Sequence, residues 1–179
     1  RRSSDLHITI STVHPDMMSG GWTFEKDDHG ANGDTLFDLP FARDIYTRAD
    51  PKFSGRVTVP ILWDKQQETI VSNESSEIIR MFNSAFNDVT GNTDDLWPAH
   101  LQAEIEPVNE RIYDTLNNGV YRCGFATTQD AYDEAVHPLF ETMDWLEERL
   151  STNRYLMGDR ITEADWRLFT TLVRFDPVY

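Results

Sequence analysis

Cysteine is nearly absent from this sequence, and basic residues are scarce. The single cysteine, Cys123, excludes an intrachain disulfide framework and a cysteine-based zinc cluster. The 16 Lys and Arg stand against 31 Asp and Glu, giving a net charge of -15, so a surface that binds a nucleic-acid backbone is not expected. The 5 histidines lack the spacing of metal ligands, and we expect no metal site.

Long apolar runs are also missing. No stretch approaches the roughly 18 residues that span a bilayer. Arg1 and Arg2 are followed by polar residues, not by the apolar core of a signal peptide. Hydrophobic residues still make up 39% of the chain and aromatic residues 12%, enough for a buried core. These properties predict a soluble, cytoplasmic, globular protein without nucleic-acid or membrane partners.

The first half of the chain has the pattern of a mixed α/β domain. Apolar and polar residues alternate over 6–13, which predicts a half-buried strand. We expect a loop at 17–33 and a helix at 35–48. Two strands, at 56–63 and 69–72, should form a hairpin, and a second helix should follow at 75–86. We therefore expect one α/β domain over residues 1–86.

The period becomes helical after a polar linker at residues 87–98. Apolar residues recur at steps of three and four in two stripes: Leu101, Ile105, Val108, Ile112 and Leu116, then Val136, Leu139, Met143, Leu146 and Leu150. Such stripes are typical of amphipathic helices that share a core. Residues 99–179 are therefore expected to form an all-helical domain.

Local signals predict where these helices begin and end. Asn117-Asn118-Gly119 is a common C-terminal stop and should end the first of them. Thr162 and Asp165 have the spacing of a capping box, with Asp in place of the usual Glu. A last helix is expected from Glu163 to about Phe175, ended by Asp176-Pro177.

Pro60 interrupts an otherwise good strand. Proline removes one donor from a β-ladder, so its place inside a strand needs a reason. One solution is a cis Val59-Pro60 bond at a turn that faces a ligand. The peptide before such a proline can pair its own N–H and C=O with an extended peptide.

Taken together, the order of elements and several motifs resemble glutathione S-transferases, whose thioredoxin-like half precedes a helical half. More narrowly, the sequence is similar to the glutathionyl-hydroquinone reductases, the Xi class. The matching segments are Gly21-Trp22-Thr23-Phe24, residues 54–60 (SGRVTVP), residues 71–75 (VSNES), residues 117–121 (NNGVY) and residues 174–179 (RFDPVY). The last two are the most specific to the reductases.

The sequence departs from this family at one important point. The family's nucleophile is a cysteine in a Cys-Pro-Trp-type motif after the first strand, and no such motif occurs here. That first strand lies between the strands matched by residues 6–13 and 57–63, so without it buried backbone groups would be unpaired. We therefore expect an incomplete thioredoxin-like domain, part of a longer polypeptide truncated at both ends. The alternative is a degenerate, inactive copy.

Glutathione has two carboxylates, one amine and one thiol, and residues at the entry to the 75–86 helix suit it. The Ser75 hydroxyl and the free N–H groups of a helix start suit a carboxylate, and the Glu74 carboxylate suits the amine. The alternative is that Ser75 is simply an N-cap and Glu74 faces solvent. The resemblance favours the binding role.

The resemblance also implies the remaining site residues. It implies that Trp22, Arg56, Val59, Glu74 and Ser75 contact glutathione, and that Tyr121 and Tyr179 are catalytic. Both tyrosines would line the hydroquinone pocket and hydrogen-bond its phenolic oxygens, which suits stabilisation or protonation of a phenolate. From the residues alone, Trp22 also fits a hydrophobic plug, Arg56 a solvated strand end and Tyr121 a core tyrosine.

The activity implied is glutathione-dependent reduction of glutathionyl-hydroquinones to hydroquinones with release of glutathione disulfide. The nucleophilic cysteine would lie upstream of this sequence, because Cys123 falls in the helical half and is expected only to pack there. Glutathione is then a co-substrate, quinone or hydroquinone conjugates are the other ligands, and a homodimer is expected. The alternatives are a non-catalytic transferase-like binding module and an ordinary glutathione-conjugating transferase.

Overall fold

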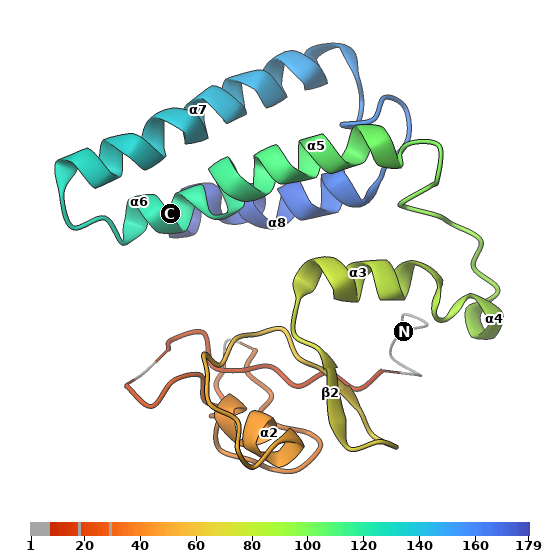
Figure 1. Ribbon diagram of the computed structural model, residues 1–179, viewed down its shortest axis with the longest axis vertical. Helices are drawn as coiled ribbons and strands as arrows, with labels where there is room; N and C mark the ends of the chain where they lie inside the picture. The colour runs from red at the N-terminus through yellow and green to blue at the C-terminus, as the bar shows by residue number, and fades with distance from the viewer. Residues whose placement is uncertain (1–7, 18, 29) are drawn as a thin grey trace. The chain divides into compact units, whose positions relative to one another are not determined.

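The computed structural model describes residues 8–17, 19–28 and 30–179, which form two compact units (Figure 1). The first unit extends to Phe82 and includes Asp88–Thr90, while the second takes Asn83–Asn87 and Gly91–Tyr179. The first contains a small sheet with helices, and the described part of the second is helical. The predicted order of a mixed half before a helical half is confirmed.

The first unit is built around a hairpin and two helices. Helix α2 (Ala42–Ala49) precedes strands β1 (Leu62–Asp64) and β2 (Thr69–Ser72), and helix α3 (Ser75–Ser84) follows them. The strands pair antiparallel, as predicted, and the Asp64 carboxylate closes the turn by accepting the N–H groups of Gln66 and Gln67. Phe24, Ala42 and Ile45 form the buried cluster beneath them.

The strand predicted at residues 6–13 is wrong over its described part. Leu6 and His7 lie outside the described residues, and Thr12 forms only an isolated bridge, to Gly33. The Thr12 N–H donates to the Asn32 carboxamide oxygen at 2.6 Å, and the Thr12 hydroxyl donates to the Gly30 carbonyl at 2.9 Å. A loop thus takes the groups that a ladder would use.

The helix predicted at residues 35–48 begins seven residues later than expected, at Ala42. The buried Asp34 carboxylate accepts the N–H groups of Leu36, Phe37 and Leu39, which folds this stretch into a turn. Asp38 has a positive φ of 57°, which a right-handed helix does not allow. The turn ends at Pro40, whose carbonyl accepts the Phe24 N–H.

The strand predicted at residues 56–63 is also too long, because β1 begins only at Leu62. Pro60 has no N–H to donate, and the backbone of Thr58 is occupied by a side chain. The Tyr46 hydroxyl donates to the Thr58 carbonyl at 2.8 Å and accepts the Thr58 N–H at 3.4 Å. A buried phenol therefore replaces the neighbouring strand that Thr58 would otherwise need.

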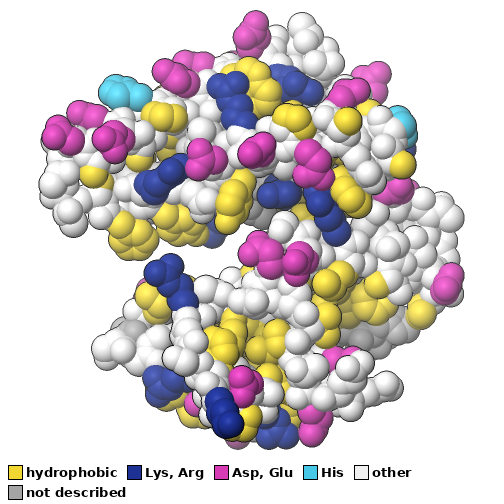
Figure 2. Space-filling model, viewed as in Figure 1, with side chains coloured by type: hydrophobic (Ala, Val, Ile, Leu, Met, Phe, Trp, Pro, Cys, Tyr) yellow, Lys and Arg dark blue, Asp and Glu magenta, His cyan; other side chains and the backbone are white. Residues whose placement is uncertain are grey.

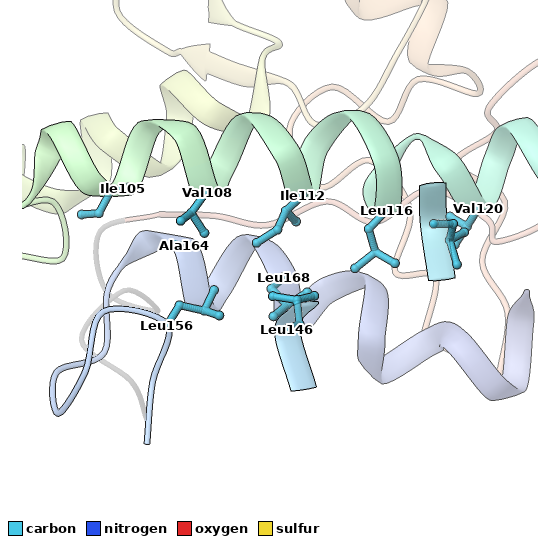
Figure 3. Packing of buried hydrophobic residues seen from close by; sticks show 10 residues of the cluster. Ile105, Val108, Ile112, Leu116, Val120, Leu146, Leu156, Ala164 and Leu168 are labelled. Carbon is cyan, nitrogen blue, oxygen red and sulfur yellow. The ribbon is translucent and has the colours of Figure 1, made fainter. Parts of the chain in front are cut away.

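The second unit consists of helices joined by short connections. The short helix α4 (Asn87–Thr90) begins in the second unit with Asn87, and its other residues belong to the first. The helices that follow are α5 (Gln102–Ile112), the π-helix η1 (Tyr113–Asn117), α6 (Gly119–Gly124), α7 (Gln129–Thr152) and α8 (Glu163–Val178). Figure 3 shows Ile105, Val108, Ile112 and Leu116 in order along one side of α5 and η1, with Leu168 of α8 opposite Ile112. The predicted stripe is therefore the inner face of this core.

Two predicted helix ends are wrong. Asn117-Asn118-Gly119 does not stop the helix, since the chain passes from η1 into α6. The Asn117 carboxamide instead donates to the Thr171 hydroxyl of α8 at 2.6 Å, and Gly119 lies so close to Leu139 that an added Cβ would be 3.4 Å from it. Helix α8 also runs through Asp176-Pro177, and its last turn closes by a bond from the Tyr179 N–H to the Phe175 carbonyl.

The predicted capping box at the start of α8 is confirmed. The Asp165 carboxylate accepts the Thr162 N–H at 2.8 Å and the Thr162 hydroxyl at 3.1 Å. Its other oxygen accepts the Leu156 N–H at 2.8 Å, so one carboxylate fixes both the helix and the loop before it. Gly158, in the loop before α8, has a positive φ of 89°.

Candidate functional site

In the first unit, the segment around Val59 presents unpaired backbone. The Val59-Pro60 peptide is cis, as the sequence suggested, and both residues are exposed. Among the described residues, neither the Val59 N–H nor its C=O has a hydrogen-bond partner. An extended peptide can pair with such groups as it would with a strand edge.

The start of α3 presents a second set of free groups. The Glu74 carbonyl accepts the N–H groups of Glu77 and Ile78, so Glu74 occupies the N-cap position and Ser75 is the first helical residue. Ser75 is therefore not the N-cap, although Glu74 does face solvent, as that alternative expected. The hydroxyl of Ser75 and the N–H groups of Ser75 and Ser76 have no acceptor in the described part of the chain.

Ser72 fixes the turn that delivers Glu74. This buried serine at the end of β2 donates its hydroxyl to the Glu77 carboxylate at 2.8 Å and accepts the Glu74 N–H at 3.0 Å. The Glu74 side chain is exposed and, within the described part of the chain, accepts only from the Ser76 hydroxyl, at 3.3 Å. Its carboxylate can therefore bind an amine at little cost in lost contacts.

A direct hydrogen bond joins these two segments. The Asn73 carboxamide nitrogen donates to the Thr58 hydroxyl at 3.0 Å. Val59 follows Thr58 and Glu74 follows Asn73, so the bond ties the two predicted binding elements together one residue before each. Residues distant in sequence are thus held in one region of this unit.

Trp22 packs against the core of this unit, whereas Arg56 is exposed. The Trp22 ring packs against the cluster of Phe24, Ala42 and Ile45, and its carbonyl accepts the Ala42 N–H at 2.9 Å. Arg56 is exposed, and its guanidinium makes no hydrogen bond or ion pair with any described residue. A free guanidinium can bind a carboxylate.

In the second unit, the structure brings Tyr121 and Tyr179 together. Their hydroxyls are hydrogen-bonded at 3.2 Å although 58 positions separate them in sequence, and their rings meet edge to face at 5.6 Å. Burial, followed by the hydrogen bond that the Tyr179 hydroxyl donates to Tyr121, raises the pKa of Tyr179 to about 12 from an ordinary 10.0, although Arg174 lowers it. Both side chains are half exposed, so a ligand can reach the paired hydroxyls.

Phe125 extends this aromatic pair, and the sequence analysis missed it. Its ring is stacked on that of Tyr121, with centroids 6.5 Å apart, yet 80% of the residue is exposed. The signal was present in the sequence, because Phe125 falls outside both apolar stripes. An exposed aromatic ring beside two phenols can stack on a flat aromatic ligand.

Cys123 lies nearby in sequence but is poorly suited to act as a nucleophile. Burial raises the pKa of its thiol, and the opposing effect of Arg122 is smaller. The side chain packs against the helical core. Because the thiolate is the reactive form, the packing role predicted for Cys123 fits this environment.

The acidic residues do not gather into a metal site. Across residues 8–17, 19–28 and 30–179, no group of three or more His, Cys, Asp or Glu is placed to hold a metal ion. Figure 2 shows acidic side chains spread over the helices of the second unit with Lys and Arg between them. Within the described part, no helix is both long and apolar enough to span a membrane.

The chain is similar to known proteins over most of its length. Residues 129–179 match the family model described as glutathione S-transferase, C-terminal domain. The glutathionyl-hydroquinone reductase YqjG of Escherichia coli is 57% identical over 172 residues, which are 96% of this chain and 52% of that protein. The chain thus spans about half the length of this relative.

Solved structures agree with the sequence relatives. A glutathione-bound structure of YqjG has a TM-score of 0.92 over 94% of this chain and 55% of that one. Glutathione transferase Xi 1 from Trametes versicolor is 54% identical, with a TM-score of 0.88 over 94% of this chain and 60% of that one. The incomplete thioredoxin-like domain followed by helices is therefore a glutathione S-transferase fold. The chain belongs to the Xi class of glutathione S-transferases, the family of the glutathionyl-hydroquinone reductases.

Proposed function

We propose that the whole protein reduces glutathionyl-hydroquinones with a second glutathione, releasing the hydroquinone and glutathione disulfide. The names of the similar reductases support this activity, and the glutathione in the YqjG structure supports the co-substrate. We assign glutathione binding to a domain over residues 1–86 and phenol recognition to a helical domain over 99–179, joined by the linker 87–98. The protein would be a cytoplasmic homodimer without a metal cofactor.

The first unit would bind the tripeptide through groups it leaves unpaired. The backbone of Val59 pairs with the cysteinyl part, the Ser75 hydroxyl and the N–H groups at the start of α3 bind the γ-glutamyl carboxylate, and Glu74 binds the amine. Arg56 binds a carboxylate and Trp22 covers the ligand. A helix start suits a carboxylate because its N–H groups and dipole favour negative charge.

The sulfur chemistry needs a thiolate that Cys123 does not provide. A cysteine outside residues 1–179 attacks the sulfur of the conjugate, forming an S–S bond while the S–C bond to the ring breaks. The electrons of the broken bond leave with the ring, which takes up a proton to become the hydroquinone. Glutathione then attacks the mixed disulfide, giving glutathione disulfide and restoring the thiolate.

Tyr121 and Tyr179 would act on the phenolic oxygens. A pair of accessible phenols donates hydrogen bonds to an oxygen on which negative charge develops, and this stabilises the departing hydroquinone. The raised pKa of Tyr179 keeps its hydroxyl protonated at neutral pH. The observation that carries the proposal is this hydroxyl pair, formed by the two segments most specific to the reductases.

The test uses the full-length protein with a glutathionyl-hydroquinone and glutathione. Wild type should release hydroquinone and glutathione disulfide in equal amounts, measured by chromatography. Tyr121→Phe should lower kcat about 100-fold because it removes a phenolic donor. Tyr132→Phe on α7 is the matched control, since Tyr132 is 41% exposed against 45% for Tyr121, and it should keep wild-type kcat.

Three results would contradict the proposal. An unchanged kcat in Tyr121→Phe would show that the tyrosine pair does not take part in the reaction. Conjugation of a chloro-nitroaromatic without reduction would indicate an ordinary conjugating transferase, and glutathione binding with neither activity would indicate a binding module. The comparisons do not favour these two alternatives, because the similar protein YqjG is named a reductase.

A further inference from the structure

Tyr46 makes an unusual set of contacts for a core residue. It is only 4% exposed, lies on α2, and packs its ring against Phe53 with centroids 4.8 Å apart. Its hydroxyl nevertheless bonds both backbone groups of Thr58, donating to the C=O at 2.8 Å and accepting the N–H at 3.4 Å. The Thr58 hydroxyl lies 3.5 Å from the same oxygen.

Asn73 holds the same threonine from the other side. Its carboxamide nitrogen donates to the Thr58 hydroxyl at 3.0 Å, while Asn73 itself is exposed and belongs to neither β2 nor α3. A polar side chain in a short connection ordinarily hydrogen-bonds the backbone of its own turn. Here its side chain reaches 15 positions back in sequence, to the residue that Tyr46 also grips.

The hydrogen bonds among Tyr46, Thr58 and Asn73 form a network, and two of its residues each stand one position before a residue proposed to bind glutathione. Thr58 precedes Val59, whose backbone is unpaired among the described residues, and Asn73 precedes Glu74, the N-cap of α3. A ligand that bonds both places depends on their separation. Because fixing that separation beforehand reduces the entropy lost on binding, the network should strengthen binding without touching the ligand.

We infer that Tyr46 and Asn73 are positioning residues for glutathione, which act through Thr58 to hold the Val59 backbone and the start of α3 in register. The inference rests on the proposed function and extends it to two residues that contact no ligand. Loss of either side chain frees one binding element relative to the other. Binding should therefore weaken although every proposed contact residue is still present.

The test is the Kd for glutathione, measured by isothermal titration calorimetry on the full-length protein well below its Tm. Tyr46→Phe should raise Kd about tenfold and Asn73→Ala about threefold, the range expected for lost hydrogen bonds. The double variant should raise Kd by less than the product of the two, because both side chains act on Thr58. Asn73→Ala changes an exposed residue, so it keeps the test open if Tyr46→Phe fails to fold.

Asp34→Asn is the matched control for a merely structural effect. Asp34 is buried in the same unit and accepts three backbone N–H groups, but it makes no hydrogen bond to Thr58 or Asn73. It should lower Tm and leave Kd within about twofold of wild type. Wild-type Kd in both Tyr46→Phe and Asn73→Ala, or an equal rise in Asp34→Asn, would overturn the inference. Wild-type protein without glutathione affinity, or Glu74→Ala with unchanged affinity, would overturn the proposed function itself.

Discussion

Different kinds of contact stabilise the two units of this chain. The second buries a continuous apolar core that includes Ile105, Ile112 and Leu116 and is built from helices of up to 24 residues. The described part of the first has a smaller buried cluster, and side-chain hydrogen bonds to backbone, such as those of Asp34 and Tyr46, hold its irregular segments. Packing stabilises one unit, whereas polar contacts shape the other and place its free backbone groups.

Truncation of matched isoleucines would test this difference most strongly. Ile112 is 1% exposed in the helical core, whereas Ile70 on β2 is only partly buried. Ile112→Ala should lower the unfolding free energy of its unit by about 3 kcal/mol, and Ile70→Ala should cost roughly half as much, because less surface is lost and less cavity is left.

Hydrogen exchange read by mass spectrometry reports each unit separately, which a single two-state transition would not. Peptides from α5, α7 and α8 should exchange faster in Ile112→Ala. Peptides from 42–84 should do so in Ile70→Ala. An equal loss of stability in the two variants would show that the units do not differ in this way.

Helix caps offer the next largest effect. Asp165→Ala removes the acceptor for two N–H groups and one hydroxyl at the start of α8, and should cost about 2 kcal/mol. Ser72→Ala, its counterpart in the first unit, leaves the Glu74 N–H without its acceptor and should cost about 1 kcal/mol. Hydrogen exchange read by mass spectrometry checks both substitutions, each in its own unit, with Asp165→Asn expected to recover part of the loss. A larger cost for Ser72→Ala would reverse the comparison.

The tyrosine pair should make a smaller contribution to the free energy of unfolding, and this contribution depends on pH. Because the pKa of Tyr179 is raised to about 12, the folded state favours its neutral phenol. Its stabilising contribution is therefore present below the unfolded value of about 10 and is lost as pH rises through about 12. Tyr121→Phe removes the hydrogen bond, so the pKa of Tyr179 should fall but stay above 10, since burial is the larger cause.

Ultraviolet difference titration measures the pKa of Tyr179, and the variant Tyr179→Phe identifies which part of the signal belongs to this residue. An ordinary pKa for Tyr179 in the wild-type protein would contradict the geometry of the pair. An unchanged pKa in Tyr121→Phe would show that burial alone sets it.

Helices were more predictable than strands, for a physical reason. The stripe from Leu101 to Leu116 records contacts three and four residues apart, and the Thr162–Asp165 cap is equally local. Strand pairing depends on distant partners, which the pattern at residues 6–13 did not reveal. Asn32 and Tyr46 take the backbone groups that those strands would have used.

The candidate site was predictable to a similar degree. Family motifs named Tyr121 and Tyr179, but only the fold shows that their hydroxyls meet. The sequence also placed Val59 and Glu74 at a turn and a helix start, where free backbone groups were expected. The bond from Asn73 to Thr58 joins two polar residues that no periodic pattern marks, so it required the structure.

If the unpaired backbone of Val59 receives glutathione as proposed, hydrogen exchange of its amide is the sharpest test. By NMR on the full-length protein, saturating glutathione should slow exchange of the Val59 N–H about tenfold or more. Ile10, whose N–H also lacks a partner among the described residues, should not change. Unaltered exchange of the Val59 N–H at saturating glutathione would show that the Val59 backbone does not bind glutathione.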